Sequence, residues 1–388
     1  MLPAHQGVVT TRGLQEWACL LPQELLSAAA ARLLGWQTQE PAVLSDTTVR
    51  LLVRQHGQLL RHAEQAEATA LLARPDQAAL APVLVPHDQP RRRAGWPVDL
   101  TAAVEAALTA EQPQPPPGVS WADWERVVAA RRADADQPIE ALRQLGPRLA
   151  TDEGLLTVDE VLTRQATGHA FWELRTAKLA TPAGYCYVSG TGTAFLQVLL
   201  ALTLVTVGPH WALLFISGQA RWIRTFFTEA FTGVARRTHL LDWYHLERKC
   251  RDLSSRICRA HEAKRLFLRR LYRRLWAGKV AEAVTLLEAY RPRAKNEVVL
   301  EELLGYLQAR VEWIPNYRQR RRAQQYIGSG HTEKANDLIV ARRQKRGGMQ
   351  WSLETSDGLA ALRTLLLSGG WDRYWAEREI LPLVAAAA

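Results

Sequence analysis

The chain has 388 residues and a formal net charge of +10, with 47% hydrophobic and 23% charged residues. This balance is typical of a folded protein, and the length leaves room for two or three domains. No run approaches the roughly 18 apolar residues of a membrane helix, which excludes a membrane-spanning protein. The four scattered cysteines form no CxxC pair for zinc. Since the start also lacks a secretory signal, we expect a cytoplasmic protein.

Residues 13–65 have the periodicity of packed helices, because leucines and alanines recur at spacings of three and four. Gly35 is expected to end one helix, and Ser45 stands at the N-cap position of the next. Helix, short turn and helix form the outline of a helix-turn-helix, so residues 1–81 are predicted to be a helical DNA-binding region. Two packed helices without a DNA-binding role are the alternative.

Proline is concentrated in residues 82–120. Because proline lacks an amide donor and resists helix formation, this stretch is predicted to be a linker with at most one short helix near 99–110. Residues 121–153 are predicted to be a helical connector, with helical patterning over 120–148. Neither stretch indicates chemistry.

From residue 154 the pattern changes to short apolar and alternating runs. They predict elements in the order strand, strand, strand, helix, strand, helix, strand. The runs cover residues 155–158, 171–178, 185–188, 195–207, 211–216, 221–231 and 238–241. A basic helical stretch over about 244–325 and a final helix from about 330 follow. This order predicts an α/β fold: a ribonuclease H-like core over 154–388 with a helical insertion, preceded by the all-α, helix-turn-helix-like region.

The positive charge is concentrated in the same half of the chain. Between Arg248 and Lys295 there are 15 Lys and Arg residues against 4 Asp and Glu residues. Further basic clusters run over Arg318–Arg322 and Arg342–Arg346. Such clusters bind polyanions because contact with phosphates releases counterions. One cluster alone is equally well a solvated helical face, but three in one half favour nucleic acid.

The most specific motif lies near the C-terminus. YIGSGHTE runs from Tyr326 to Glu333, and ARRQKRGGMQWS runs from Ala341 to Ser352. This block resembles the SG…E…R.KR.GM.WS block of DDE transposases in the Kra and Lre insertion-sequence families, relatives of the Mutator group. The segments TVDE, ending at Glu160, and LLDWYH, ending at His245, are similar to two further family segments. The stretch from residue 7 to the helix at Ser45 is also similar, so the resemblance covers most of the chain except its proline-rich middle.

This resemblance implies DNA transposition by strand cleavage and transfer, with Mg²⁺ in a two-metal site held by three carboxylates. Asp159 maps onto the first catalytic and metal-binding carboxylate, and Glu333 maps onto the third. The family's second aspartate falls on Gly218, which has no carboxylate. Whether the chain is an active enzyme therefore stays open. Asp242 is the candidate substitute in catalysis, and its alternative role is to cap the helix that starts at Trp243.

Further residues near these motifs are candidates for contact with DNA. Arg221 and Trp222 follow the Gly218 position and are predicted to stack on a base or line a DNA channel, although Trp222 has the alternative of packing its helix onto the sheet. His245 is predicted either to orient a ligand or to pack in the core. A basic group is predicted to share a helix with Glu333 and to contact the phosphates of the element end. It consists of Arg342, Arg343, Lys345 and Arg346.

The expected partner is double-stranded DNA, namely the terminal inverted repeats of an insertion sequence and its target, within the nucleoid. The predicted function is that of a transposase-like protein that binds these ends and, if active, cuts and transfers strands. The alternative is a catalytically dead or repurposed transposase that only binds DNA. A third interpretation, an RNA-binding protein, predicts no preference for inverted repeats. Assembly into a homo-oligomer is a further expectation, and a membrane partner is not.

Overall fold

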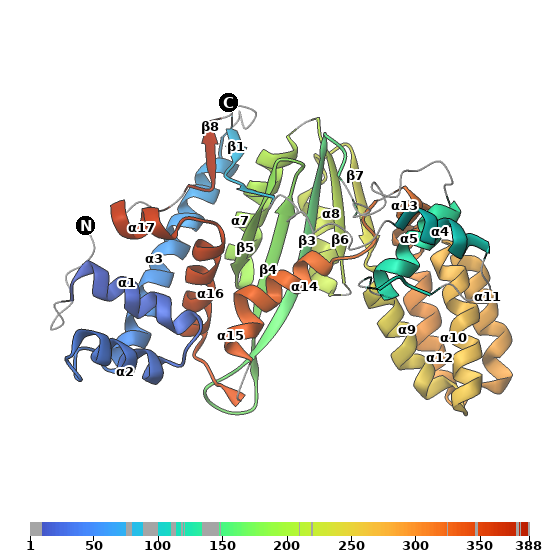
Figure 1. The fold of residues 1–388 in the computed structure, drawn as a ribbon, viewed down its shortest axis with the longest axis horizontal. Coiled ribbons are helices and arrows are strands. Elements are labelled where there is room, and N and C mark those ends of the chain that lie inside the picture. Colours follow the sequence, from blue (N-terminus) through green and yellow to red (C-terminus); the bar gives the residue numbers. More distant parts are fainter. Residues whose placement is uncertain are drawn as a thin grey trace. The chain divides into compact units, whose positions relative to one another are not determined.

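A computed structural model defines the fold (Figure 1). The chain divides into two compact units. The first comprises Met1–Pro86, Leu149–Arg320 and Ile327–Ala388, and the second comprises His87–Arg148 and Arg321–Tyr326. The structure describes residues 10–74, 80–87, 100–109, 114–117, 119, 121–133, 147, 149–208, 210–218, 220–323, 325–345, 348–377, 380 and 382–386.

A six-stranded mixed sheet organises the first unit, with strand order β2-β5-β4-β3-β6-β7. Its strands are β2 (Val85–Pro86), β3 (Glu153–Arg164), β4 (Phe171–Ala180), β5 (Gly184–Gly190), β6 (Ala212–Ser217) and β7 (Arg237–Leu241). Strands β3, β4 and β5 are antiparallel neighbours, whereas β6 runs parallel to both β3 and β7. The predicted mixed α/β character is confirmed.

Strand β3 is longer than its sequence pattern predicts. The apolar run that predicts the first strand covers residues 155–158 and is followed by Asp159 and Glu160, but β3 continues to Arg164. Its parallel partner β6 stops opposite Val158, whereas its antiparallel partner β4 stays paired with it as far as Arg164. The expectation was wrong because the longer ladder, not the apolar run, determines the end of the strand.

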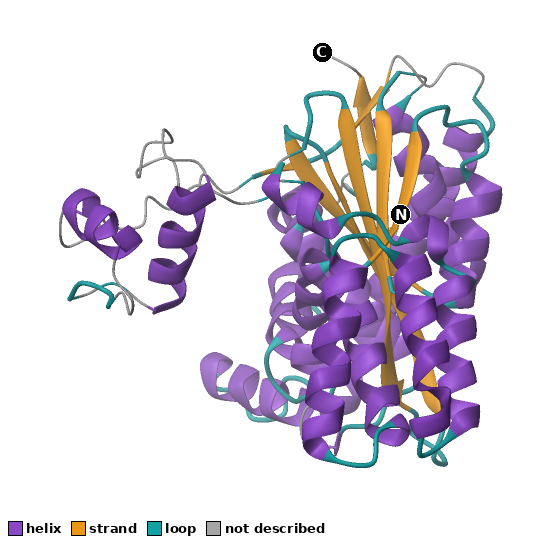
Figure 2. Ribbon diagram, turned by 90° about the vertical axis from the view of Figure 1, so that its right-hand side faces the viewer, coloured by secondary structure: helices purple, strands orange, loops and turns teal. Residues whose placement is uncertain are grey.

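Helices cover both faces of this sheet (Figure 2). On one face, α7 (Gly192–Val207) and α8 (Arg221–Ala230) bury a core that contains Leu156, Val158 and Phe215. The opposite face is covered by α14 (Gly330–Asn336), the π-helical turn η4 (Asp337–Ala341), α15 (Arg342–Gln344) and α16 (Leu353–Leu367). Consecutive β3 residues therefore point their side chains to different helical layers.

The N-terminal helices belong to the same compact unit as the sheet, not to a separate domain ending at residue 81. They are α1 (Arg12–Leu20), η1 (Leu21–Gln23), α2 (Ser27–Thr38) and α3 (Asp46–Leu72), and α17 (Trp371–Glu377) packs with them. Ser45 caps α3 as predicted, accepting a hydrogen bond from the amide of Thr48 at 3.1 Å. Helix α2, however, passes Gly35 and ends at Thr38.

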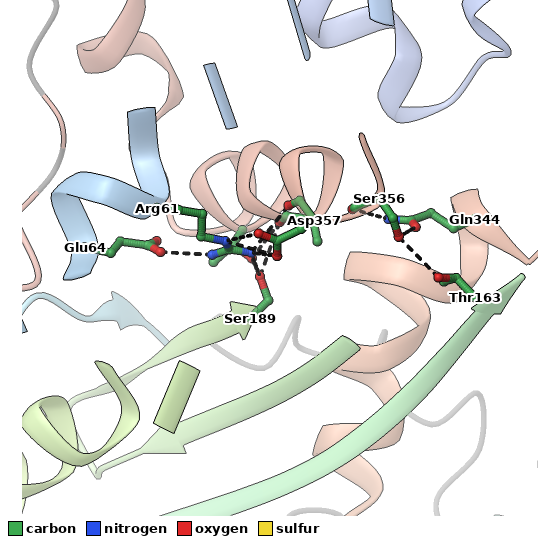
Figure 3. Close-up of polar contacts among 9 residues, drawn as sticks. Arg61, Glu64, Thr163, Ser189, Gln344, Ser356 and Asp357 are labelled. Carbon is green, nitrogen blue, oxygen red and sulfur yellow. Dashed lines mark hydrogen bonds and ion pairs between the residues drawn. The ribbon is translucent and has the colours of Figure 1, made fainter. Parts of the chain in front are cut away.

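Two features attach α3 to α16. A Cβ on Gly57 would lie 2.2 Å from the Cα of Gly358, so the helices touch backbone to backbone. Beside this contact, the guanidinium of Arg61 donates to the carboxylate of Asp357 at 3.0 Å, to Glu64 at 2.9 Å and to the hydroxyl of Ser189 at 3.0 Å (Figure 3). Each charge is paired, as buried ionic groups require. The N-terminal helices are therefore fastened to the core.

The predicted basic insertion is a helical bundle with its own core. It consists of α9 (Trp243–Ile257), α10 (His261–Trp276), α11 (Val280–Tyr290), η2 (Arg291–Arg293) and α12 (Glu297–Gln308), followed by η3 (Val311–Trp313) and α13 (Tyr317–Arg322). Leu246, Leu271 and Leu287 are among its fully buried residues. The hydroxyl of Tyr317 donates to the carbonyl of Leu241 at 2.7 Å and joins the bundle to the end of β7.

The second unit contains α4 (Leu100–Thr109) and α5 (Trp121–Ala133), which pack through Val104 and Trp124. Helix α4 confirms the short helix expected in the proline-rich stretch, and α5 confirms part of the helical connector. Most of the rest of both segments lies outside the described residues. In the first unit, β1 (Leu80–Pro82) pairs with β8 (Val384–Ala386). None of the helices in the described part of the chain combines the length and apolar character that a membrane crossing demands.

Candidate functional site

Three adjacent strands bring the candidate residues to one edge of the sheet. Val158 of β3 pairs with Ser217 of β6, and Ser217 pairs in turn with Leu241 of β7. The residues that follow these three positions are Asp159, Gly218 and Asp242. The sheet therefore places the two acids on either side of the glycine.

Asp159 faces the α14 layer. Its Oδ2 accepts a hydrogen bond from the amide Nδ2 of Asn336 at 2.8 Å, and the Oδ1 of Asn336 accepts one from Thr176. Burial raises the pKa of Asp159, and the nearby carboxylate of Glu333 raises it as well, whereas His245 acts in the opposite direction. Asp159, His245 and Glu333 thus share one electrostatic environment, although they come from separate segments of the chain.

Glu333 lies in the first turn of α14 at the edge of this environment. Its side chain is half-exposed, and its Oε1 is 4.0 Å from the guanidinium of Arg248 on α9. Helix α14 packs on β3 and β4, which explains how a residue so late in the chain reaches the first strand of the core. Asp159 and Glu333 are therefore near enough for the charge of one to affect the pKa of the other, and their shared catalytic role stays a prediction.

An imidazole lies against Gly218, the position that the resemblance assigns to the second carboxylate. A Cβ built on Gly218 would lie 3.2 Å from both Cδ2 and Nε2 of His245. Few real Cβ atoms have contacts this short, so a side chain at this position requires the ring to move. The sequence left two roles open for His245, orienting a ligand or packing in the core. In the structure its ring packs against Gly218.

Asp242 is committed to holding the backbone around it. Its Oδ1 accepts hydrogen bonds from the amides of Tyr244 at 2.6 Å and His245 at 3.2 Å, and its Oδ2 accepts from both the amide and the hydroxyl of Ser329. These four donors occupy the roughly four lone-pair positions of a carboxylate. The helix-cap role is confirmed, because α9 begins at Trp243 with Asp242 as its N-cap.

The same contacts couple Asp242 to His245. The Nδ1 of His245 lies 3.5 Å from the Oδ2 of Asp242. Burial acts to raise the pKa of Asp242, but hydrogen bonds from His245 and Ser329 outweigh it and lower the pKa. Conversely, the interaction with Asp242 raises the pKa of His245 against the effect of its burial. Asp242 and His245 therefore interact with each other, and the contact is an ion pair only when the imidazole is protonated.

These residues do not fit a two-metal centre. Within the described part of the chain, no group of three or more His, Cys, Asp and Glu side chains is arranged to hold a metal ion. Asp159 and Glu333 remain as acids, the glycine between the strand ends has no ligand atom, and Asp242 has no acceptor position left. The described residues therefore offer no carboxylate at the position where the resemblance expects the ligand that bridges two Mg²⁺ ions.

The predicted DNA contacts have different surroundings. The indole of Trp222 donates from Nε1 to the Oε2 of Glu160 at 2.6 Å, and the guanidinium of Arg175 stacks over its ring at 4.0 Å. Trp222 thus packs α8 onto the sheet, which is its alternative role. Glu160 lies on the opposite face from Asp159, as the period-two rule predicts. The side chain of Arg221 lies outside the described residues.

The basic group after Glu333 is also divided. Arg343 is buried, and it donates from Nε to the carbonyl of Pro22 at 2.6 Å and lies over the ring of Trp351. The prediction that it contacts phosphate is corrected to a structural role. The π-helical turn before it adds a residue to the helix, which changes the direction of the side chains that follow. Arg342 and Lys345 are exposed, and Arg346 lies outside the described residues.

Helix α10 exposes individual arginines that the sequence indicated only as part of the basic segment from Arg248 to Lys295. Arg265, Arg269, Arg270 and Arg273 are all exposed. Arg265 pairs with Glu262, but for the other three no ion pair is found among the described side chains. The sequence signal is the spacing of four residues between Arg265, Arg269 and Arg273, because side chains at that spacing share one side of a helix.

Comparisons with known proteins leave the family open. No protein-family model matches the chain, and no curated protein matches it. The resemblance to transposases therefore depends on the motifs and on the arrangement of the residues themselves.

Proposed function

We propose that the chain is a DNA-binding protein of the insertion-sequence transposase type whose strand-transfer centre is incomplete. The observation that carries this proposal is the strand edge at which Asp159 and Asp242 flank Gly218, with the ring of His245 against the glycine. The motif acids are assembled around a position that has no carboxylate.

The topology supports a ribonuclease H-like core. Three antiparallel strands, β3 to β5, are followed by β6 and β7 parallel to β3, with α7 and α8 in the connections. This is the element order proposed from the sequence for that core. The meeting of Asp159 and Glu333 at one site supports the same assignment, since they belong to two separate motifs of the resemblance.

The insertion bundle supports DNA as the partner. Its segment from Arg248 to Lys295 contains 15 basic residues against 4 acidic ones, and α10 exposes arginines that lack acidic partners among the described residues. Contacts with about four phosphates would give a salt dependence with a slope of about −3.6 in a double-logarithmic plot. Terminal inverted repeats in the nucleoid, bound by a homo-oligomer, are the partners that the transposase resemblance implies.

The chain's own residues account for binding without cleavage. Asn336 holds the Asp159 carboxylate, His245 fills the space beside Gly218, and Asp242 caps α9. Each group thus stabilises the fold at the place where a reacting phosphate would lie. The alternative, an active transposase, needs a further acid at this edge.

The test uses labelled duplexes that carry the element's own ends, with shuffled duplexes and double-stranded RNA of equal length as controls. Cleavage is measured in Mg²⁺ and Mn²⁺ for the wild type, Gly218→Asp and Glu333→Gln. We expect the wild type to bind the element ends in preference to the control duplexes and to cleave none of them. Equal binding of RNA and shuffled DNA would contradict the DNA-end assignment. Cleavage by the wild type that Glu333→Gln abolishes would contradict the incomplete centre.

A further inference from the structure

An acidic groove lies on the face of the sheet opposite the motif acids. It has a volume of about 820 Å³ and is formed by β3, β4, α7 and α8. Its lining includes Glu160, Glu173, Leu196, Trp222, Phe226 and Glu229. The size is that of a typical ligand site, and the mixture of apolar walls with a few charged groups is also typical of one.

Among the described side chains, an ion pair is found for only one of the three carboxylates. Glu173 pairs with Arg175 at 2.8 Å. For Glu160 and Glu229, no cationic partner is found among the side chains that the structure describes, and the only hydrogen bond found for Glu160 comes from the neutral indole of Trp222. The described lining therefore carries three carboxylates, and the one guanidinium found beside them, that of Arg175, pairs with Glu173 and lies opposite Glu160 in the register of β3 and β4. Three carboxylates against one guanidinium disfavour a phosphate group in the groove.

Beside the groove, two of its lining residues already hold a cation, which is an internal example of the ligand chemistry that the groove suits. The guanidinium of Arg175 lies 4.0 Å from the centre of the Trp222 ring and donates to Glu173 at 2.8 Å. Aromatic faces attract cations, and a carboxylate beside the ring adds a charge-assisted hydrogen bond. The apolar side chains of Leu196 and Phe226 suit the aliphatic part of such a ligand.

We propose that this groove binds an organic cation, namely a guanidinium or ammonium group on an aliphatic stem. Glu160 and Glu229 supply the charge, and Leu196 and Phe226 contact the stem. The ligand group has two sources, an arginine side chain of a polypeptide or a free polyamine. This inference is independent of DNA binding, because the motif acids and the α10 arginines take no part in it.

The test measures binding to the full chain by calorimetry with three probes: acetyl-Leu-Arg-Leu-amide, the same peptide with citrulline in place of arginine, and spermidine. Citrulline keeps the shape of arginine but has no charge. Binding of the arginine peptide at least about tenfold more tightly than the citrulline peptide is expected, as for the loss of one charge-assisted hydrogen bond. Binding of spermidine alone would assign the free-amine source and keep the cation assignment.

Glu160→Gln and Glu229→Gln are the informative variants, because glutamine keeps the size of the side chain and, at position 160, an acceptor for the Trp222 indole. Each is expected to weaken cation binding by about threefold to tenfold. Glu288→Gln, at an exposed glutamate of α11, removes the same charge elsewhere and should leave binding unchanged. Two results would overturn the proposal. One is equal binding of the arginine and citrulline peptides with no binding of spermidine, and the other is an equal loss of cation affinity in all three variants. DNA binding by Glu160→Gln, measured in parallel, should stay within about twofold of the wild type.

Discussion

The two faces of β3 place neighbouring acids in opposite surroundings. Asp159 points toward α14, where Asn336 donates to it and His245 is nearby, whereas Glu160 points toward α8, where a tryptophan donates to it. The first acid lies among a carboxamide and an imidazole, and the second lies in a groove whose described lining carries three carboxylates. The comparison teaches that adjacency in sequence says nothing about shared chemistry within a strand, because alternate side chains enter different layers.

The largest expected effect is that of a substitution at Asp242. Asp242→Ala removes the cap of α9 and leaves the donors of Ser329 and His245 without their acceptor. Breaking a buried, hydrogen-bonded charge pair typically costs about 3 to 5 kcal/mol of unfolding free energy. Chemical denaturation measures this loss, with the exposed Asp252→Ala on the same helix as the control. A loss below about 1 kcal/mol would mean that Asp242 is not structural, and its role as a metal ligand would become the better interpretation.

Two histidines sharpen the comparison through pH. His239 lies in the aromatic layer beside Phe215 and Phe227, and burial lowers its pKa to about 4. The unfolded chain then binds a proton that the folded chain does not between about pH 6.5 and 4, so stability falls as the pH falls through this window. The loss reaches about 3 kcal/mol at its lower end. The test measures the unfolding free energy of the wild type and of His239→Gln from pH 7 to 4. The wild-type value minus the variant value should fall by this amount over the range.

His245 should have the opposite pH dependence, because its pKa is raised by Asp242. Its contribution is fully present below the pKa of the unfolded chain and is lost as the pH rises through the higher folded value. Comparing the wild type with His245→Gln over the same pH series tests this sign. A contribution that grows as the pH rises would show that the Asp242 contact is not an ion pair.

A smaller effect is expected at the glycine itself. Gly218→Ala should cost about 1 to 3 kcal/mol, since its Cβ meets the His245 ring at 3.2 Å. In a double-mutant cycle, the alanine should cost much less in a His245→Ala background. Additive effects would show that the ring does not occupy this space. The same contact predicts that Gly218→Asp supports DNA cleavage better in that background than alone.

The smallest effect is expected in the acidic groove. Trp222→Phe removes the hydrogen bond to Glu160 but keeps an aromatic ring beneath Arg175. A loss of about 1 kcal/mol of unfolding free energy is expected, as for a typical hydrogen bond. Thermal unfolding of this variant beside Phe226→Leu, which changes packing without a polar group, separates the two contributions. A loss as large as that of Asp242→Ala would remove the contrast between the two faces.

Local sequence pattern by itself determined most of the secondary structure of this protein. Periodicity located the strands and helices of the core, and polar residues before helices identified the caps Ser45 and Asp242, because these signals depend on neighbours within one turn or one strand. The motifs also predicted that Asp159 and Glu333 act at one site, and the structure shows an electrostatic interaction between them. Only the tertiary structure decided the length of β3, the burial of Arg343, the closeness of His245 to Gly218 and the charge of the groove. Each of these depends on side chains from distant segments that meet only when the sheet and its helices pack.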